Sequence, residues 1–364
     1  MSGKGNISSG HLFATMILFE FGTALVVPIG LTAEQGSWLA ILMALPGGIL
    51  LFLVFDYLFR QYPKLILSGY IRAIVGRYLG WPISLLYVAF FIYIAARNLR
   101  EAGDLLVTTA YDQTPILLIH AVMITAVIYT LYKGLEVFCR LGQIYLLIII
   151  GLGFMGNVFI LFSGAVDLRN LLPLLGKGWK SVLLTAYPNI FLFPFAELVC
   201  FCTILPHLNT IESARKTGVA AMIIAGFLLS MTHAIELMVL GGNVYARSTF
   251  PLFTTISLVN IAHFLQRLDA IVILTLIIGV FFKMSIYCYA AMAVAADLFH
   301  IEDLRKMAYP IGIIVLFISI FSALSYPEHV EEGMASIKFI LPVFAFLIPM
   351  SLFIIHLIRK RFSH

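Results

Sequence analysis

Long apolar runs separated by short polar or charged segments are the dominant pattern of this chain. Stretches of about 20 predominantly apolar residues can cross a lipid bilayer as α-helices. The pattern predicts ten such helices, at about residues 11–31, 36–59, 82–110, 115–132, 141–163, 181–206, 217–240, 269–298, 309–326 and 339–358. We therefore expect an all-α polytopic membrane protein that forms one transmembrane domain over residues 1–364.

Two of the predicted spans are interrupted by residues that break helices. Residues 18–30 (LFEFGTALVVPIG) carry a glutamate, two glycines and a proline, and residues 187–200 (YPNIFLFPFAELVC) carry two prolines and a glutamate. Glycine and proline also occur in ordinary transmembrane helices. Broken helices, however, hold solutes near the bilayer midplane in many transporters, typically once in each structural repeat. The matched pair therefore favours a binding site.

Ten spans divide into two halves of five, and an interrupted span opens each half. An odd number of spans per half turns the second half upside down relative to the first. We predict a five-plus-five inverted repeat, with halves at about residues 11–163 and 181–358 and with helices 1 and 6 broken.

The distribution of charged residues predicts the orientation of the chain in the membrane. Only 11% of the residues are charged and 62% are hydrophobic, which excludes an ordinary soluble domain. The net charge of +5 does not indicate nucleic-acid binding, because the basic residues are dispersed over the loops. Most of them fall on one alternate set of loops, so the positive-inside rule predicts both termini in the cytoplasm. Residues 63–80 resemble an interfacial helix on that side, and residues 250–265 a re-entrant or lid-like segment on the other.

Six polar side chains share one face of the third predicted span. Arg97 and Glu101, and likewise Arg100 and Asp104, are opposite charges four residues apart, which should pair along the helix. Each charge at this depth costs at least about 2.5–3.5 kcal/mol, so the strip should face the protein interior. It either locks the span to its neighbours or lines a solute or water path. The six positions are Tyr93, Arg97, Arg100, Glu101, Asp104 and Thr108.

Lys283 lies near the middle of the eighth predicted span, where its ammonium group needs a partner. Glu20, Glu197 and Glu236 are the candidate partners. Lys283 could be a fixed structural cation, or it could take part in proton or cation coupling. Glu236 also shares a helical face with His233, but a single pair of this kind is weak evidence for a metal.

Motifs for catalysis are not apparent in the sequence. It has no GxSxG, no glycine-rich loop followed by lysine and no convincing cysteine–histidine arrangement. We expect neither an enzyme nor a cofactor nor a metal site, and we expect the four cysteines to be buried free thiols.

Several segments together resemble a known family. They are FGTALVVPIG near the N-terminus, DLRNLLPLL at 167–175, FPFAELVCFCTILPHL at 193–208, and QRLDAIVI at 266–273 followed by Lys283. The chain resembles the spore germination permeases, the B subunits of bacterial endospore germinant receptors, in the amino acid–polyamine–organocation superfamily. The likeness runs nearly from end to end. It departs from the family pattern at Ala196, where the family has glycine, and at Gln266, where it has glutamate.

This resemblance implies a transporter fold used as a nutrient sensor in the spore inner membrane. It also implies two partners, a large membrane-anchored A subunit and a lipoprotein C subunit. We predict that the chain binds a small nutrient, an amino acid, and signals by changing conformation, which requires different affinities for the ligand in the two states.

The predicted site lies between broken spans one and six, where freed backbone N–H groups would bind the ligand carboxylate. The alternative is a proton- or cation-coupled amino-acid transporter; a scaffold without a ligand would leave the paired breaks unexplained. The predicted ligand-binding residues are Gly22, Thr23, Ala24, Asn98, Glu101, Phe195, Glu197 and Tyr287. The residues predicted to carry an ion, a proton or a structural charge are Glu20, Arg97, Glu236 and Lys283.

Overall fold

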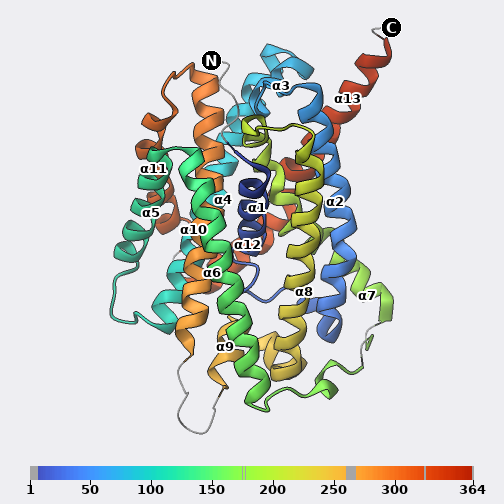
Figure 1. The fold of residues 1–364 in the computed structure, drawn as a ribbon, viewed down its shortest axis with the longest axis vertical. Helices are drawn as coiled ribbons and strands as arrows, with labels where there is room; N and C mark the ends of the chain where they lie inside the picture. Colours follow the sequence, from blue (N-terminus) through green and yellow to red (C-terminus); the bar gives the residue numbers. More distant parts are fainter. Residues whose placement is uncertain (1–6, 174, 177, 260–267, 324, 363–364) are drawn as a thin grey trace.

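The computed structural model describes residues 7–173, 175–176, 178–259, 268–323 and 325–362, and over these ranges the chain is almost entirely helical (Figure 1). Within them, nine helical runs are long and apolar enough to cross a membrane. The broken first helix, α1 (Ser9–Phe21) with the turns after it, makes the tenth crossing, so the predicted polytopic fold is confirmed. The nine runs are η1 with α2 (Leu31–Gly36 and Ser37–Gln61), α4 (Arg77–Thr109), α5 (Ile116–Lys133), α6 (Leu135–Phe162), α7 to η4 (Gly178–Thr203), α8 (Ser213–Arg247), α10 (Asp269–Phe299), η6 with α11 (Leu304–Phe321) and α12 to α13 (Tyr326–Phe362).

α1 lies at the centre of the bundle, against α6, α8 and α10 (Figure 1). It begins with a capping box, in which the Ser8 hydroxyl accepts from the N–H of His11 at 3.2 Å and the His11 ring accepts from the N–H of Ser8 at 3.3 Å. Every residue from Ala14 to Phe21 is buried. Protein therefore encloses the end of α1, as a helix that breaks at membrane depth requires.

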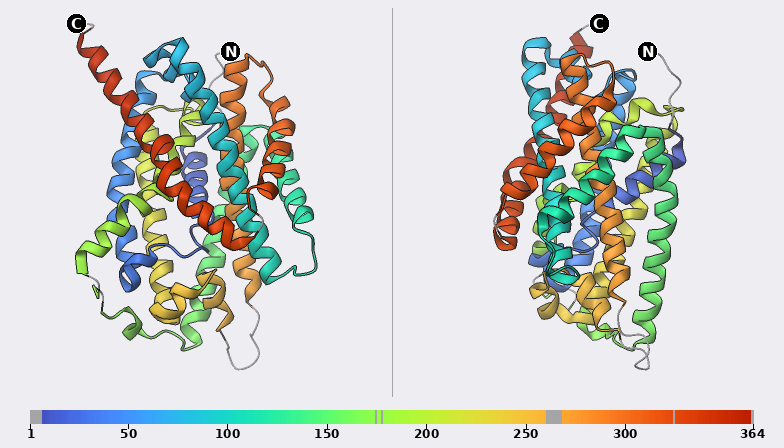
Figure 2. Two further views of the ribbon diagram at one scale, coloured as in Figure 1. Left: turned by 180° about the vertical axis from the view of Figure 1, so that it is seen from behind. Right: turned by 90° about the vertical axis from the view of Figure 1, so that its left-hand side faces the viewer.

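The crossing helices run alternately up and down, so α13 ends at the end of the molecule where α1 begins (Figures 1 and 2). The short helix α3 (Leu67–Val75) lies at that same end, and α9 (Pro251–Ser257) lies at the opposite end (Figure 1). α10 is the most enclosed of the nine runs and packs along α4, whereas α6 and the run from α12 to α13 are the least enclosed.

The two halves of the chain each open with a broken helix, which gives the predicted five-plus-five inverted arrangement. In the second half the break follows α7 (Gly178–Leu184), passes through η3 (Thr185–Ile190) and continues in the tight helix η4 (Phe195–Thr203). The repeat boundaries at 11–163 and 181–358 stay a prediction.

Three segments refine the boundaries expected from the sequence. The segment predicted to form an interfacial helix contains the helix α3, and its location at the membrane interface stays a prediction. The lid-like segment contains α9 at its start, and its residues 260–265 lie outside the described part of the chain. The last helical run begins at Tyr326 rather than near residue 339, because Ser325 caps it and Pro327 suits a first helical turn.

Candidate functional site

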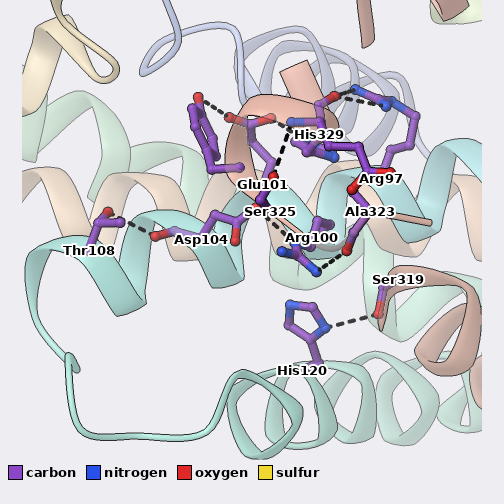
Figure 3. A network of polar contacts seen from close by, with 12 residues as sticks. Arg97, Arg100, Glu101, Asp104, Thr108, His120, Ser319, Ala323, Ser325 and His329 are labelled. Atoms are coloured by element: carbon purple, nitrogen blue, oxygen red, sulfur yellow. Dashed lines mark hydrogen bonds and ion pairs between the residues drawn. The ribbon is translucent and has the colours of Figure 1, made fainter. Parts of the chain in front are cut away.

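The charged strip predicted in the third span lies on α4 and faces α11 (Ala308–Phe321) and α12 (Tyr326–Ala335), as Figure 3 shows. Arg100 donates from Nε to Asp104 at 2.8 Å and from Nη1 to the carbonyl of Ala323 at 2.8 Å. Both charged side chains are more than nine-tenths buried. The predicted pair is confirmed, and it ties α4 to the end of α11.

The predicted pair between Arg97 and Glu101 is wrong. Arg97 donates to Glu332 at 3.0 Å, and Glu101 accepts from the ring of His329 at 2.8 Å and from the hydroxyl of Tyr326 at 3.3 Å. A charged pair along one helix contributes only about 0.2–0.5 kcal/mol, so partners across a helix interface can replace it. All three partners belong to α12, most of which was expected to lie in a loop between the predicted spans 309–326 and 339–358.

The first break begins at Gly22, which ends α1 with φ 29° and ψ −122°. Glycine adopts a positive φ at little cost, and other residues do so rarely. A Cβ atom at this position would also collide with Cδ of Lys283. The N–H of Gly22 donates to the carbonyl of Leu18 at 3.0 Å, so this amide remains engaged within the helix.

Side chains of α8 hold the chain beyond the first break. Nε2 of His233 donates to the carbonyl of Ala24 at 3.0 Å, and the hydroxyl of Tyr245 donates to the carbonyl of Ile29 at 3.0 Å. Backbone groups that leave a membrane helix need such partners, because lipid offers none. The break is therefore supported by the neighbouring helix.

The second break contains two of the prolines noted in the sequence. Tyr187 leaves the helical region, with φ −125° and ψ 122°, immediately before Pro188, and Pro194 precedes η4. Proline removes an N–H group and interrupts the helical ladder. Glu197 follows in the first turn of η4 and is 2% exposed.

Glu197 is the partner of Lys283. The ammonium nitrogen lies 2.5 Å from a carboxylate oxygen of Glu197, and both side chains are buried. The ammonium also lies 4.5 Å from the centre of the Phe193 ring and 5.3 Å from that of Phe19, distances suited to cation–π attraction. Of the other candidates, Glu236 pairs with His233 at 2.9 Å instead.

Glu20 shares the same buried region. Its side chain is completely buried, and neither carboxylate oxygen has a hydrogen-bond partner within the described ranges. Glu20 follows Phe19, whose ring centre lies 5.3 Å from the Lys283 ammonium. Two carboxyl groups and one ammonium group thus lie together at the end of α1.

A cavity of about 300 Å³ lies between the two breaks, within the size range of small-molecule sites. Four of the predicted ligand-binding residues line it: Thr23, Asn98, Glu101 and Glu197. The amide nitrogen of Asn98 donates to the carbonyl of Ile94 at 2.8 Å, while its oxygen has no partner among the residues described. Arg97 adds a positive charge to the wall, and Val27, Ile94, Phe193 and Ile337 add apolar surface.

The other four predicted ligand-binding residues lie outside the lining. Gly22 and Ala24 adjoin Thr23 in the backbone of the break. Tyr287 lies one helical turn after Lys283 and packs on Phe19 at 5.3 Å, ring centre to ring centre. The side chain of Phe195 is buried against α2, where a Cβ atom at Gly48 would lie 2.6 Å from that of Phe195.

Sequence reasoning missed the contribution of α12 to this cavity. Tyr326, Val330 and Met334 line it, and His329 bonds to Glu101 behind it. The sequence S-x-x-E at 325–328 is typical of the start of a helix, and this signal could have predicted α12. The amide of Glu328 does donate to the Ser325 hydroxyl, at 3.5 Å.

Comparison with known proteins places the chain in a family. Residues 6–327 match the family described as "Spore germination protein". Spore germination protein KB of Bacillus subtilis (strain 168) is 36% identical over 359 residues, which cover 98% of this chain and 96% of that protein. This family and its fold are those of non-enzymatic membrane proteins.

Solved transporter structures share the fold. A Na⁺-coupled sialic acid symporter in a substrate-bound outward-open state superposes with a TM-score of 0.69 at 12% identity, over 95% of this chain and 80% of that chain. MhsT in complex with L-phenylalanine superposes with a TM-score of 0.63 at 15% identity, over 94% of this chain and 87% of that chain. At these identities the likeness establishes the fold alone.

Proposed function

Because the chain belongs to the spore germination protein family, we propose that it is the nutrient-binding membrane subunit of a spore germinant receptor. A small germinant, an amino acid, binds in the cavity between the two broken helices. The observation that carries this proposal is the cavity itself, since both breaks and the charged strip of α4 meet around it.

The lining suits a zwitterion with a moderately apolar side chain. The carboxylates of Glu101 and Glu197 can accept from an ammonium group, and so can the side-chain oxygen of Asn98, which has no partner among the described residues. Arg97 and backbone N–H groups near Thr23 can donate hydrogen bonds to the carboxylate of the ligand. A carboxylate is stabilised by such cationic and dipolar groups. MhsT, which has a similar fold, binds L-phenylalanine, and this supports a site of the same class.

Signalling requires that the ligand favour one conformation over another. The contacts of α12 provide a means. His329 and Tyr326 bond to Glu101, whose carboxylate lies at the cavity, so a ligand that takes over this carboxylate competes with α12 for it. Binding would then shift the position of α12 relative to α4.

The proposed setting is the spore inner membrane, with both termini in the cytoplasm. The proposed partners are an A-type and a C-type subunit of the receptor. The names of the family and of its relatives support the germination context, and the loop charges support the orientation. Co-purification of the chain with both subunits from spore membranes tests the assembly.

A nutrient dose–response in spores tests the function. Glu101→Gln keeps the shape of the side chain and removes its charge, and hydrogen bonds to charged groups contribute about 1.5–3 kcal/mol. We expect the half-maximal nutrient concentration to rise by about tenfold or more. Glu136→Gln is the matched control, because Glu136 is exposed and pairs, within the described part of the chain, with the exposed Arg140 on the same helix α6.

Equal abundance of the two variants, checked by blotting, makes the comparison valid. Parental nutrient sensitivity in abundant Glu101→Gln spores would contradict binding at this cavity. A change of the same size in Glu136→Gln spores would show that the effect is not local.

The second candidate function is a proton- or cation-coupled amino-acid transporter. The observation that favours it is the cluster of Glu20, Glu197 and Lys283, in which an added proton or cation would balance the second carboxylate. Vesicles containing the purified chain distinguish the two functions. A receptor subunit binds labelled amino acid without accumulating it, whereas uptake driven by a proton or sodium gradient would favour the transporter.

A further inference from the structure

A second cavity, of about 440 Å³, lies among α1, α6, α8, α9 and α10 and shares no lining residue with the first. Its wall is largely apolar. Phe21 and Leu25 come from the region of the first break, Ile160 comes from α6, and Ile271 and Val272 come from α10. The cavity therefore suits the apolar body of a ligand rather than a cluster of water molecules, which would need several polar partners.

The wall formed by α6 faces lipid. Three of its lining residues, Ile150, Phe154 and Leu161, are 48%, 72% and 68% exposed. α6 is a membrane span at the edge of the bundle (Figure 2), so these side chains contact hydrocarbon rather than water. A ligand can thus reach the cavity sideways from the bilayer.

Two oxygen atoms of the lining have no hydrogen-bond partner in the described part of the chain: Oε1 of Glu236 and Oγ1 of Thr255. Each of these residues is 1% exposed. The other polar side chains of the lining are satisfied within their own helices, since Asn157, Thr232 and Thr275 all donate to backbone carbonyls four residues earlier. Buried polar groups are usually hydrogen-bonded, so these two oxygens can take their partners from a molecule bound in the cavity.

The other oxygen of Glu236 is held in place by His233. Nε2 of His233 donates to the carbonyl of Ala24, and Nδ1 lies 2.9 Å from Oε2 of Glu236. A lone pair on Nδ1 would repel an ionised carboxylate at that distance, so one proton lies between them. The pair is neutral overall whichever group keeps the proton. Oε1 of Glu236 can therefore accept a hydrogen bond from a neutral donor, and the neutral pair does not need a cation to balance its charge.

We propose that this cavity binds an uncharged amphiphile from the bilayer, an aliphatic alcohol, whose hydroxyl donates to Glu236 and accepts from Thr255. A hydroxyl has both a donor and acceptor sites, as this pair of oxygens requires. A hydrocarbon chain would leave both oxygens unpaired. An alkylammonium ion would lose its hydration to enter and would meet a pair that is already neutral.

The test uses a photoactivatable diazirine analogue of 1-octanol on membranes that contain the full-length chain, with labelled peptides identified by mass spectrometry. We expect saturable labelling of the α6, α8 and α10 segments around the cavity. Unlabelled 1-octanol should compete, and octane at the same membrane concentration should not. Equal competition by octane would overturn the proposal, because the cavity would then be an apolar groove for lipid chains.

Glycines of α6 provide a matched pair of variants. A Cβ atom at Gly156 would lie 3.4 Å from Ile256 and 3.9 Å from Ile271, both in the lining, whereas one at Gly151 would meet nothing within 4 Å. Gly156→Leu should fill the cavity and lower the saturable labelling more than tenfold. Gly151→Leu makes the same change outside the cavity and should keep parental labelling. Equal labelling of the two variants would place the probe elsewhere.

A change in the hydroxyl group tests the polar contact separately. Thr255→Val keeps the shape of the side chain and should weaken labelling severalfold, and Thr255→Ser, which keeps the hydroxyl, should restore it. Parental labelling of Thr255→Val would remove this contact from the proposal. Both variants leave the nutrient cavity intact, so the outcome is independent of the proposed germinant site.

Discussion

Lys283 is the residue that most clearly links packing to charge in this molecule. Its ammonium group is fully buried, lies 2.5 Å from Glu197 and rests over two aromatic rings. The methylene chain of the same lysine fills the space where a side chain at Gly22 would lie. One residue therefore joins α10 to both broken helices.

Removing this ammonium should destabilise the protein. Lys283→Met leaves the carboxylate of Glu197 buried without its partner, and breaking a buried pair in this way costs about 3–5 kcal/mol. We expect a marked fall in the thermal unfolding temperature of the detergent-solubilised protein. Adding Glu197→Gln to this variant should recover part of the loss, since the remaining group is then uncharged.

Lys338→Met provides the control for that series, because Lys338 is exposed near the end of α12. It should leave the unfolding temperature within error of the parent. A Lys283→Met protein as stable as this control would show that the buried pair contributes nothing to the fold.

Sequence alone could place Lys283 in the membrane but could not choose its partner. Three glutamates on three different elements were possible partners for its ammonium group. Glu236 pairs with His233 on its own helix, and the choice between Glu20 and Glu197 depends on how α1 and η4 pack against α10. Spacing along a helix shows which pairs can form, but the packed structure decides which do: Arg100 pairs with Asp104 as the spacing predicts, whereas Arg97 pairs with Glu332 on another helix.

At the scale of elements, the break after α1 was predictable because it depends on local chemistry. A glycine, a glutamate and a proline within an apolar run indicated it, and the chain does leave the helix at Gly22. The role of α12 was not recognised, because its charged residues read as a loop between spans. It is a helix that contributes to the cavity through residues such as Tyr326 and Val330.

Closing the first break should abolish the response to nutrient. Gly22→Val would force a side chain into positive φ and into the space of Lys283, so the break and the buried pair could not both persist. Gly22→Ala is the milder form of the same change. We expect Gly22→Val spores not to respond to the nutrient, and Gly22→Ala spores to need more than ten times the parental nutrient concentration.

Gly151→Ala is the control for these variants, because a Cβ atom at Gly151 meets nothing within 4 Å. Membrane abundance of each variant should be measured in the same spores. Abundant Gly22→Val protein with parental sensitivity would mean that the break is an ordinary irregularity of the helix.

At the scale of the whole molecule, the fold follows from the length and hydrophobicity of the runs. A chain in lipid must satisfy its backbone within each segment, so apolar runs of this length leave helices as the available structure. The cavity between the breaks could be anticipated only in outline. Thr23, Asn98, Glu101 and Glu197 reach it, but Phe195 and Tyr287 turn into the core, because the rotation of each helix is set by its neighbours.

Orientation in the membrane is the property of the whole chain that remains a prediction. α3 lies at the end of the molecule where α13 ends, and the N-terminal part of α4 follows it there (Figure 1). α7 follows the loop between α6 and the second half of the chain, on the other side of the bundle by the alternation of helices. The loops that are rich in lysine and arginine lie at the end of the molecule where α13 ends, so the positive-inside rule places that end in the cytoplasm.

Cysteine accessibility tests this orientation with little background, because the four native cysteines are all buried. Tyr78, next to Arg77 at the start of α4, is 95% exposed, and Trp179 in α7 is 56% exposed. A membrane-impermeant maleimide applied from outside should label Trp179→Cys and leave Tyr78→Cys unlabelled until the membrane is opened. Gly151→Cys, which lies within the span of α6, should react poorly from either side. The reverse pattern at positions 78 and 179 would invert the molecule in the membrane and place both termini outside.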